Sequence, residues 1–193
     1  MLIIMWIVLV YILFTFVSTY IHELGHALSA YALGANQVVI AKSRRSYQVE
    51  FKTYFAFEQE MTEKQNIIVS VAGVGLQFIF SMILIWQPFS MMLSCIALIY
   101  MPYIFFNLLP FYGLDGHYVL ENMATFKMRI WSILLYLSFC ISWIAALSGL
   151  QSILALSHSY AQWTYLLLCL LIWGQVVLKF VRYSIKGRRL EHE

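Results

Sequence analysis

Two histidines and a glutamate near the end of the first long apolar stretch have the residue types and spacing of a metal centre. His22 and His26 are four residues apart in the run His-Glu-Leu-Gly-His. On a helix, residues at positions i and i+4 project from the same face, so both imidazoles can ligate one metal ion. Glu23, about 100° further around the helix, can then reach a water molecule at that metal. The pattern predicts a metal centre with a general base beside it.

A catalytic zinc centre needs a third protein ligand and an open fourth position. Asp115 is the only aspartate in the chain, and it lies in a segment, residues 107–116, that also holds Asn107, Pro110 and Gly113. Proline and glycine break helices, which would let the carboxylate turn inward. We therefore expect Asp115 to complete the site. The Asn107 amide offers a donor and an acceptor to a bound peptide, or else satisfies backbone carbonyls that the proline frees.

The composition places these residues in a membrane protein. The 193 residues are 62% hydrophobic and 11% charged, and the mean hydropathy is +0.79. A soluble domain carries about twice that charged fraction, so a soluble fold is excluded. An ionisable group at membrane depth costs at least a few kcal/mol unless it has a partner, which favours a bound cation at the histidines. Placement of these groups at the aqueous boundary would explain their polarity but not their spacing.

Five apolar stretches are long enough to cross a bilayer, which takes a helix of about 20 residues. They are residues 2–32, 66–86, 91–109, 130–150 and 163–183. We therefore predict an all-α polytopic membrane protein. The first stretch lacks the basic leading region and cleavage site of a signal peptide, so we expect it to remain as a span. The first and third spans run in the same direction, which brings Asp115 to the depth of the two histidines.

The distribution of basic residues predicts the orientation. All twelve lysines and arginines lie in the segments after the first and third spans and around the C-terminus. Five spans place these segments on one face, which is cytoplasmic by the positive-inside rule. The N-terminus is then outside, and the C-terminus and the active-site end are cytoplasmic.

One polar insert, residues 36–60, follows the first span. Apolar and polar residues alternate through residues 47–58, which is the pattern of a strand, and residues 37–41 can pair with it across a turn at 43–46. We predict a small cytoplasmic β-hairpin or sheet at the membrane surface. The alternative is a hairpin that merely connects two helices.

Together the two motifs resemble the site-2 protease family of intramembrane zinc metalloproteases, which has His-Glu-x-x-His and, further along the chain, Asn-x-x-Pro-x-x-x-Leu-Asp-Gly. The matching residues are His22, Glu23, His26, Asn107, Pro110, Leu114, Asp115 and Gly116. The resemblance implies Zn²⁺ held by His22, His26 and Asp115, with Glu23 as catalytic base and Asn107 as substrate-binding residue. It also implies a three-helix catalytic core within residues 1–116, followed by two additional transmembrane helices and a basic tail in 117–193 of a single membrane domain.

The family has an Ala-Gly-Pro-x-x-Asn pattern in its second core helix, which resembles residues 72–77 here. This chain has Val74 and Gln77 in place of the proline and asparagine. The role of Gln77 therefore stays open, and we expect Gly73 and Gly75 to allow close helix packing. His117 is either a partner of the site or a passive boundary residue.

The resemblance implies hydrolysis of a peptide bond in or next to a transmembrane helix of a membrane-bound regulatory protein or signal-peptide remnant. The partners are then a transmembrane substrate and the lipid bilayer, with no nucleic acid. One alternative is another type of membrane metalloprotease, with Glu121, Glu191 or Glu193 as third ligand. A second is a non-catalytic zinc-binding membrane sensor or degenerate protease. The sequence disfavours the sensor because metal binding alone does not require Glu23.

Overall fold

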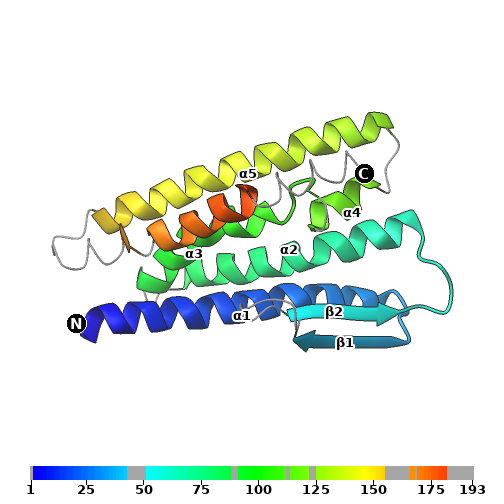
Figure 1. Cartoon of the computed structure of the whole chain (residues 1–193), viewed down its shortest axis with the longest axis horizontal. Coiled ribbons are helices and arrows are strands. Elements are labelled where there is room, and N and C mark those ends of the chain that lie inside the picture. The colour runs from blue at the N-terminus through cyan, green and yellow to red at the C-terminus, as the bar shows by residue number, and fades with distance from the viewer. Residues whose placement is uncertain are drawn as a thin grey trace.

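The computed structural model describes residues 2–42, 51–87, 91–111, 114–121, 125–154, 166–167 and 169–181. Its elements are α1 (Leu2–Ala32), β1 (Gln37–Lys42), β2 (Phe51–Ala56), α2 (Glu63–Trp86), α3 (Met91–Phe106), α4 (Asp115–Glu121), α5 (Thr125–Leu154) and an apolar helix, Cys169–Val181. The long helices lie side by side, and the two strands lie along the second half of α1 (Figure 1). The prediction of a mainly helical fold with a small sheet is confirmed.

Within the described residues, two helices are long and apolar enough to cross a membrane. They are α2 and the part of α5 from Ile130 to Ser152. The sequence predicted five spans, so by this measure the prediction was too high. One reason is that α3 has only 16 residues, which is shorter than the roughly 20 that a bilayer core requires. The fifth predicted span is described mainly as the short helix Cys169–Val181, and part of it lies outside the described residues.

The end of α3 follows from the proline that the sequence marked as a helix breaker. The backbone N–H groups of Asn107, Leu108 and Leu109 each bond to the carbonyl three residues earlier, at 3.0 to 3.3 Å. These tight turns replace the α-helical pattern just before Pro110, which has no N–H to continue it. The chain then turns into α4, which begins at Asp115.

Helix α2 has a capped start and approaches α1 closely. Thr62 forms a capping box with Gln65, which satisfies backbone groups that the first turn of a helix leaves free. Where α2 faces α1, a Cβ on Gly25 would overlap the carbonyl oxygen of Ala72 and lie 2.8 Å from the Cα of Gly73. The two helices can pack at this distance only because both glycines lack a side chain.

The bundle is built around α3, whose middle section is the most completely buried part of the chain. Ile96, Ile99, Tyr100 and Ile104 have no exposed surface. By contrast, α5 exposes large apolar side chains, including Ile133, Ile141 and Ile144, each of which is at least 60% exposed. The hydrophobic surface of this fold is therefore not all directed inward.

The predicted sheet is an antiparallel hairpin in which Val39 pairs with Tyr54 and Ile40 with Thr53. The predicted turn at 43–46 lies outside the described residues. The Phe51 ring packs edge-on against the rings of Phe16 and Tyr20, with centroids 5.2 and 5.7 Å apart. Since these two residues are one helical turn apart on α1, the contact fixes β2 against that helix.

Candidate metal centre

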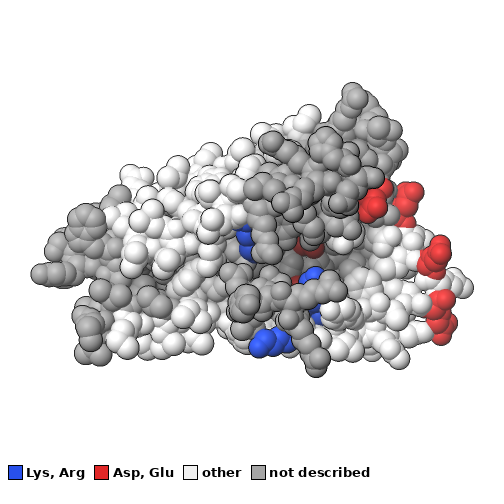
Figure 2. Space-filling model, viewed as in Figure 1, with Lys and Arg blue, Asp and Glu red and all other residues white. Residues whose placement is uncertain are grey.

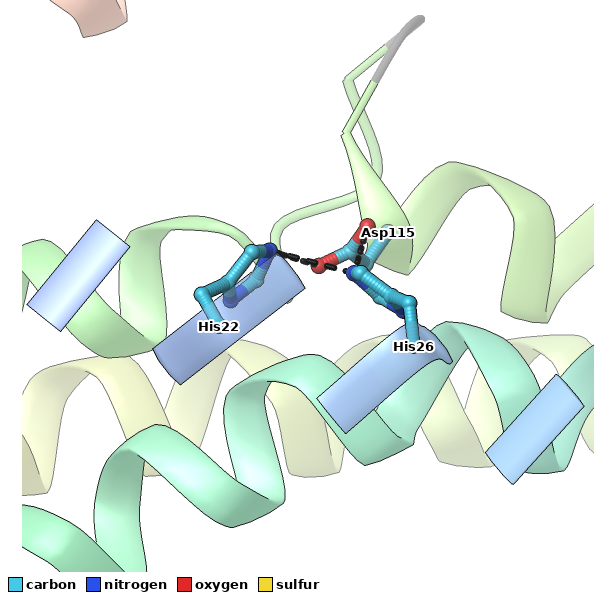
Figure 3. A group of neighbouring side chains, drawn as sticks. All are labelled: His22, His26 and Asp115. Carbon is cyan, nitrogen blue, oxygen red and sulfur yellow. Dashed lines mark hydrogen bonds and ion pairs between the residues drawn. The ribbon is translucent and has the colours of Figure 1, made fainter. Parts of the chain in front are cut away.

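The three residues predicted as metal ligands meet in the structure. His22 and His26 project from α1 toward Asp115, which lies at the first position of α4 (Figure 3). His22 Nε2 lies 3.2 Å from His26 Nε2 and 3.2 Å from Asp115 Oδ2, and His26 Nε2 lies 3.5 Å from Asp115 Oδ1. Within the part of the chain that the structure describes, this is the group of histidine, cysteine and acidic residues that could hold a metal ion.

The spacing of the three donor groups suits zinc. Ligand atoms about 2.0 to 2.1 Å from a tetrahedral Zn²⁺ lie about 3.3 to 3.4 Å from one another. The two imidazole Nε2 atoms are close to this spacing, and each is also close to it from one carboxylate oxygen, Oδ2 for His22 and Oδ1 for His26. Asp115 Oδ2 is also buried and has no aligned hydrogen-bond donor among the described residues. A buried carboxylate oxygen without a donor is costly, and a cation at this position would remove that cost.

His26 is oriented by contacts on both sides of its ring. Its Nδ1 lies 2.6 Å from the backbone oxygen of Val69, which can only accept, so Nδ1 carries the proton. A neutral imidazole with this tautomer presents the lone pair of Nε2 to a metal. On its other side the ring lies against Gly73, where an added Cβ would overlap Nε2 and approach the neighbouring ring carbon to 2.6 Å.

Asp115 is positioned by the turn that follows α3. The Gly116 N–H donates to the Asn107 carbonyl at 3.0 Å, and a Cβ at Gly116 would overlap the carbonyl of Leu108. Burial alone would raise the pKa of the Asp115 carboxyl, but the two imidazoles beside it hold that pKa below its usual value. The imidazoles therefore favour the carboxylate form of Asp115, which is the form that binds a metal.

Glu23, the predicted base, is held by the hairpin. Its Oε2 accepts a hydrogen bond from the Thr53 N–H at 2.7 Å and lies 2.8 Å from the Thr53 hydroxyl. Sequence reasoning missed Thr53, because it lies 30 residues from Glu23 and no spacing links the two. Strand alternation shows on which face a residue lies but not which helix residue it will meet.

A cavity of about 1050 Å³ connects the predicted site residues. Its lining includes His22, Glu23, His26, Asn107 and Asp115. The Asn107 side chain forms no hydrogen bond to any described residue, so nothing in this part of the chain supports a role in satisfying freed carbonyls. Its amide is available to a molecule in the cavity.

Two other polar residues considered for the site, His117 and Glu121, do not belong to the metal-binding group. His117 Nε2 lies 3.8 Å from Glu121 Oε2 within α4, and His117 does not belong to the metal-binding group. Glu121, the alternative third ligand, has a side chain that is 62% exposed and is also outside that group. Glu191 and Glu193 lie outside the described residues.

The predictions for the second core helix hold in part. Gly73 is a close-packing position, but the prediction for Gly75 was wrong, because a Cβ there would meet no atom within 4 Å. Gln77 is buried, and its Nε2 donates to the Ser18 hydroxyl at 2.8 Å while its Oε1 has no hydrogen-bond partner among the described residues. Gln77 also lines the cavity.

Comparison with known proteins identifies no relative: no protein-family model, no curated protein and no solved structure matches this chain.

Proposed function

We propose that this protein is an intramembrane zinc endopeptidase of the site-2 protease type. The observation that carries the proposal is the meeting of His22, His26 and Asp115 in one cavity that also holds Glu23 and Asn107. His22 and His26 come from one helix, Asp115 comes from a separate element, and the carboxylate of Glu23 lies in the same cavity. This combination is what metal-assisted hydrolysis requires.

A membrane location agrees with the outer surface of the bundle. On the face in Figure 2, the charged side chains that the structure describes lie from the middle of the molecule toward the end where β2 leads into α2. The end nearer the N-terminus shows none on this face. Helix α1 has 31 residues, and Glu23 is its one Asp, Glu, Lys or Arg residue. Among the described residues only α2 and α5 are long and apolar enough by themselves. We propose that α1 and the regions around α3 and Cys169–Val181 also cross the bilayer, which would give five spans.

The proposed orientation follows from the basic residues. Lys42, Lys52 and Lys64 belong to or adjoin the segment between α1 and α2, near the end of α1 that carries the metal centre. The positive-inside rule places this end in the cytoplasm and the N-terminus outside. The metal centre then lies close to the cytoplasmic boundary of the membrane.

Zn²⁺ held by His22, His26 and Asp115 would supply Lewis acidity and lower the pKa of a water molecule toward neutrality. The carboxylate of Glu23 takes the proton of the attacking water and delivers it to the leaving amine of the cut peptide bond. Asn107 lines the same cavity, and its amide holds the peptide backbone while it is attacked. The substrate is a transmembrane segment of another protein. Because the carbonyls of a helix are already hydrogen-bonded, this segment unwinds locally inside the cavity before it is attacked.

The experiment that tests the proposal compares the wild-type protein with Glu23→Gln. Each is purified in detergent and incubated with a panel of single-span membrane proteins that carry an epitope at both ends. We expect the wild type to release a tagged fragment from at least one of them, and Glu23→Gln to do so about 100-fold more slowly or less, because it lacks a general base. Both proteins should contain zinc, since glutamine at this position leaves the three ligands in place.

Two outcomes would count against the proposal. Equal cleavage by the two proteins would remove Glu23 from the base role. Zinc in both proteins without cleavage of any panel member would favour the alternative of a non-catalytic zinc-binding membrane protein.

A further inference from the structure

Glu23 of α1 is hydrogen-bonded to β2 through a single residue, Thr53. Thr53 provides two donors to one residue of α1: its N–H bonds to Glu23 Oε2 at 2.7 Å, and its hydroxyl lies 2.8 Å from the same oxygen. The hydroxyl also lies 2.8 Å from the backbone oxygen of Glu23. The single hydroxyl proton is thus shared between side-chain and main-chain acceptors of one residue.

The hydrogen bonds from Thr53 to the Glu23 carboxylate engage only one of its two oxygens, Oε2. The hydrogen bonds to the Glu23 carboxylate from the described residues all go to Oε2, and none of them goes to Oε1. A glutamate side chain has several rotatable bonds and would otherwise sample many positions. Two donors on one oxygen restrict the position of this carboxylate, which lines the same cavity as His22 and Asp115.

The strand that carries Thr53 is itself well anchored. Phe51 lies two residues before Thr53, and its ring packs against Phe16 and Tyr20 of α1. Along its other edge β2 pairs with β1, and Thr53 is opposite Ile40. A side chain held by such a support can fix a catalytic group within the tolerance that proton transfer needs.

We infer that Thr53 is a positioning residue that holds Glu23 ready to act as the base, so the hairpin is part of the catalytic machinery and not only a connection between α1 and α2. This inference rests on the proposed function. Thr53 acts through Glu23, the residue to which its N–H and hydroxyl bond among the described residues.

The test compares Thr53→Val and Thr53→Ser. Valine has nearly the shape of threonine and favours strands, so Thr53→Val removes the hydroxyl while it keeps the strand and its N–H. Serine keeps the hydroxyl. The substrate is the epitope-tagged membrane protein that the wild type cuts fastest, and kcat, KM and bound zinc are measured for each protein.

We expect kcat of Thr53→Val to fall about 10-fold or more, with KM within about twofold of wild type and the zinc content unchanged. Thr53→Ser should recover most of the lost kcat. Tyr54→Phe is the matched control, since it removes a hydroxyl from the next residue of the same strand, whose side chain is exposed. This control should behave as wild type.

The inference is overturned if Thr53→Val keeps the kcat of the wild type, or if its loss of activity comes with a loss of zinc or of thermal stability that Thr53→Ser does not share. Its failure differs from that of the proposed function. If Glu23→Gln is inactive while Thr53→Val is fully active, the protease assignment stands and only the role of Thr53 is lost.

Discussion

The imidazole of His26 can lie against α2 only because residue 73 has no side chain. Its ring occupies the place where a Cβ of Gly73 would be, and its Nδ1 bonds to Val69 one turn earlier on the same helix. Helix α2 therefore determines both the position and the tautomer of a proposed ligand that belongs to α1. Groups of this kind, which contact a ligand but not the metal, commonly change metal affinity by about 10 to 100-fold.

Gly73→Ala should weaken zinc binding by about that factor, because the added methyl group must displace the His26 ring. Gly75→Ala is the matched control, since it makes the same change two positions away in an open space. The measurement is a zinc titration of each purified protein against a competing chelator. Equal affinities for the two variants would show that the position of the His26 ring does not depend on Gly73.

Single-residue reasoning predicted which residues would meet, but not what supports them. The spacing of His22 and His26 follows from the local geometry of one helix, and Asp115 was placed with them because the first and third spans run in the same direction. The contacts of Thr53 and Val69 could not be predicted in the same way. Each depends on how two elements distant in sequence are placed in space.

At the scale of elements, the connection between α3 and α4 decides whether the site is complete. Helix α3 tightens into short turns before Pro110, and α4 begins at Asp115 with the Gly116 N–H bonded to the Asn107 carbonyl. This bond links the residue beside the proposed ligand to the proposed substrate-binding residue. A close approach of backbone to backbone at Gly116 is what keeps the bond short.

Gly116→Ala should destabilise the protein by about 1 to 3 kcal/mol and reduce bound zinc, because its methyl group would overlap the Leu108 carbonyl and force α4 away from α3. Gly174→Ala, in the helix Cys169–Val181, has nothing within 4 Å of its new Cβ and should be neutral or slightly stabilising. Thermal unfolding in detergent together with zinc analysis measures both effects. If Gly116→Ala unfolds at the wild-type temperature with full zinc, the connection is looser than the structure indicates.

The sequence predicted the elements better than it predicted their lengths. Alternation through residues 51–56 and the apolar run of α1 agree with the strands and the first helix. Apolar composition did not distinguish helical residues from the turns at 107–109, so the third span was predicted to be longer than α3. A capping box at Thr62 also starts α2 three residues before the predicted start at residue 66.

The described part of the molecule combines outward-facing apolar side chains with a cavity lined by both polar and apolar residues. Tyr11, Thr15 and Gln77 line the same cavity as the metal centre, and each has a buried polar atom with no hydrogen-bond partner among the described residues. Large apolar side chains of α5 face outward instead. Apolar side chains therefore occur both in the core around α3 and on the outer surface of the described bundle.

If the five-span topology is correct, the two ends of the chain lie on opposite sides of the membrane. In sealed inside-out vesicles, added protease should remove an epitope at the C-terminus and leave one at the N-terminus intact. Right-side-out vesicles should give the reverse pattern, which controls for an epitope that is simply inaccessible. Digestion of both epitopes in the same vesicles would require an even number of spans and would contradict the proposed orientation.

The claim on which the account depends is that one divalent ion is shared by α1 and the start of α4. It is tested most directly by zinc analysis of the purified wild type, Asp115→Ala and His117→Ala after dialysis. We expect about one zinc ion per chain in the wild type and in His117→Ala, and a small fraction of that in Asp115→Ala, since two histidines alone hold zinc weakly. Full zinc content in Asp115→Ala would contradict the account.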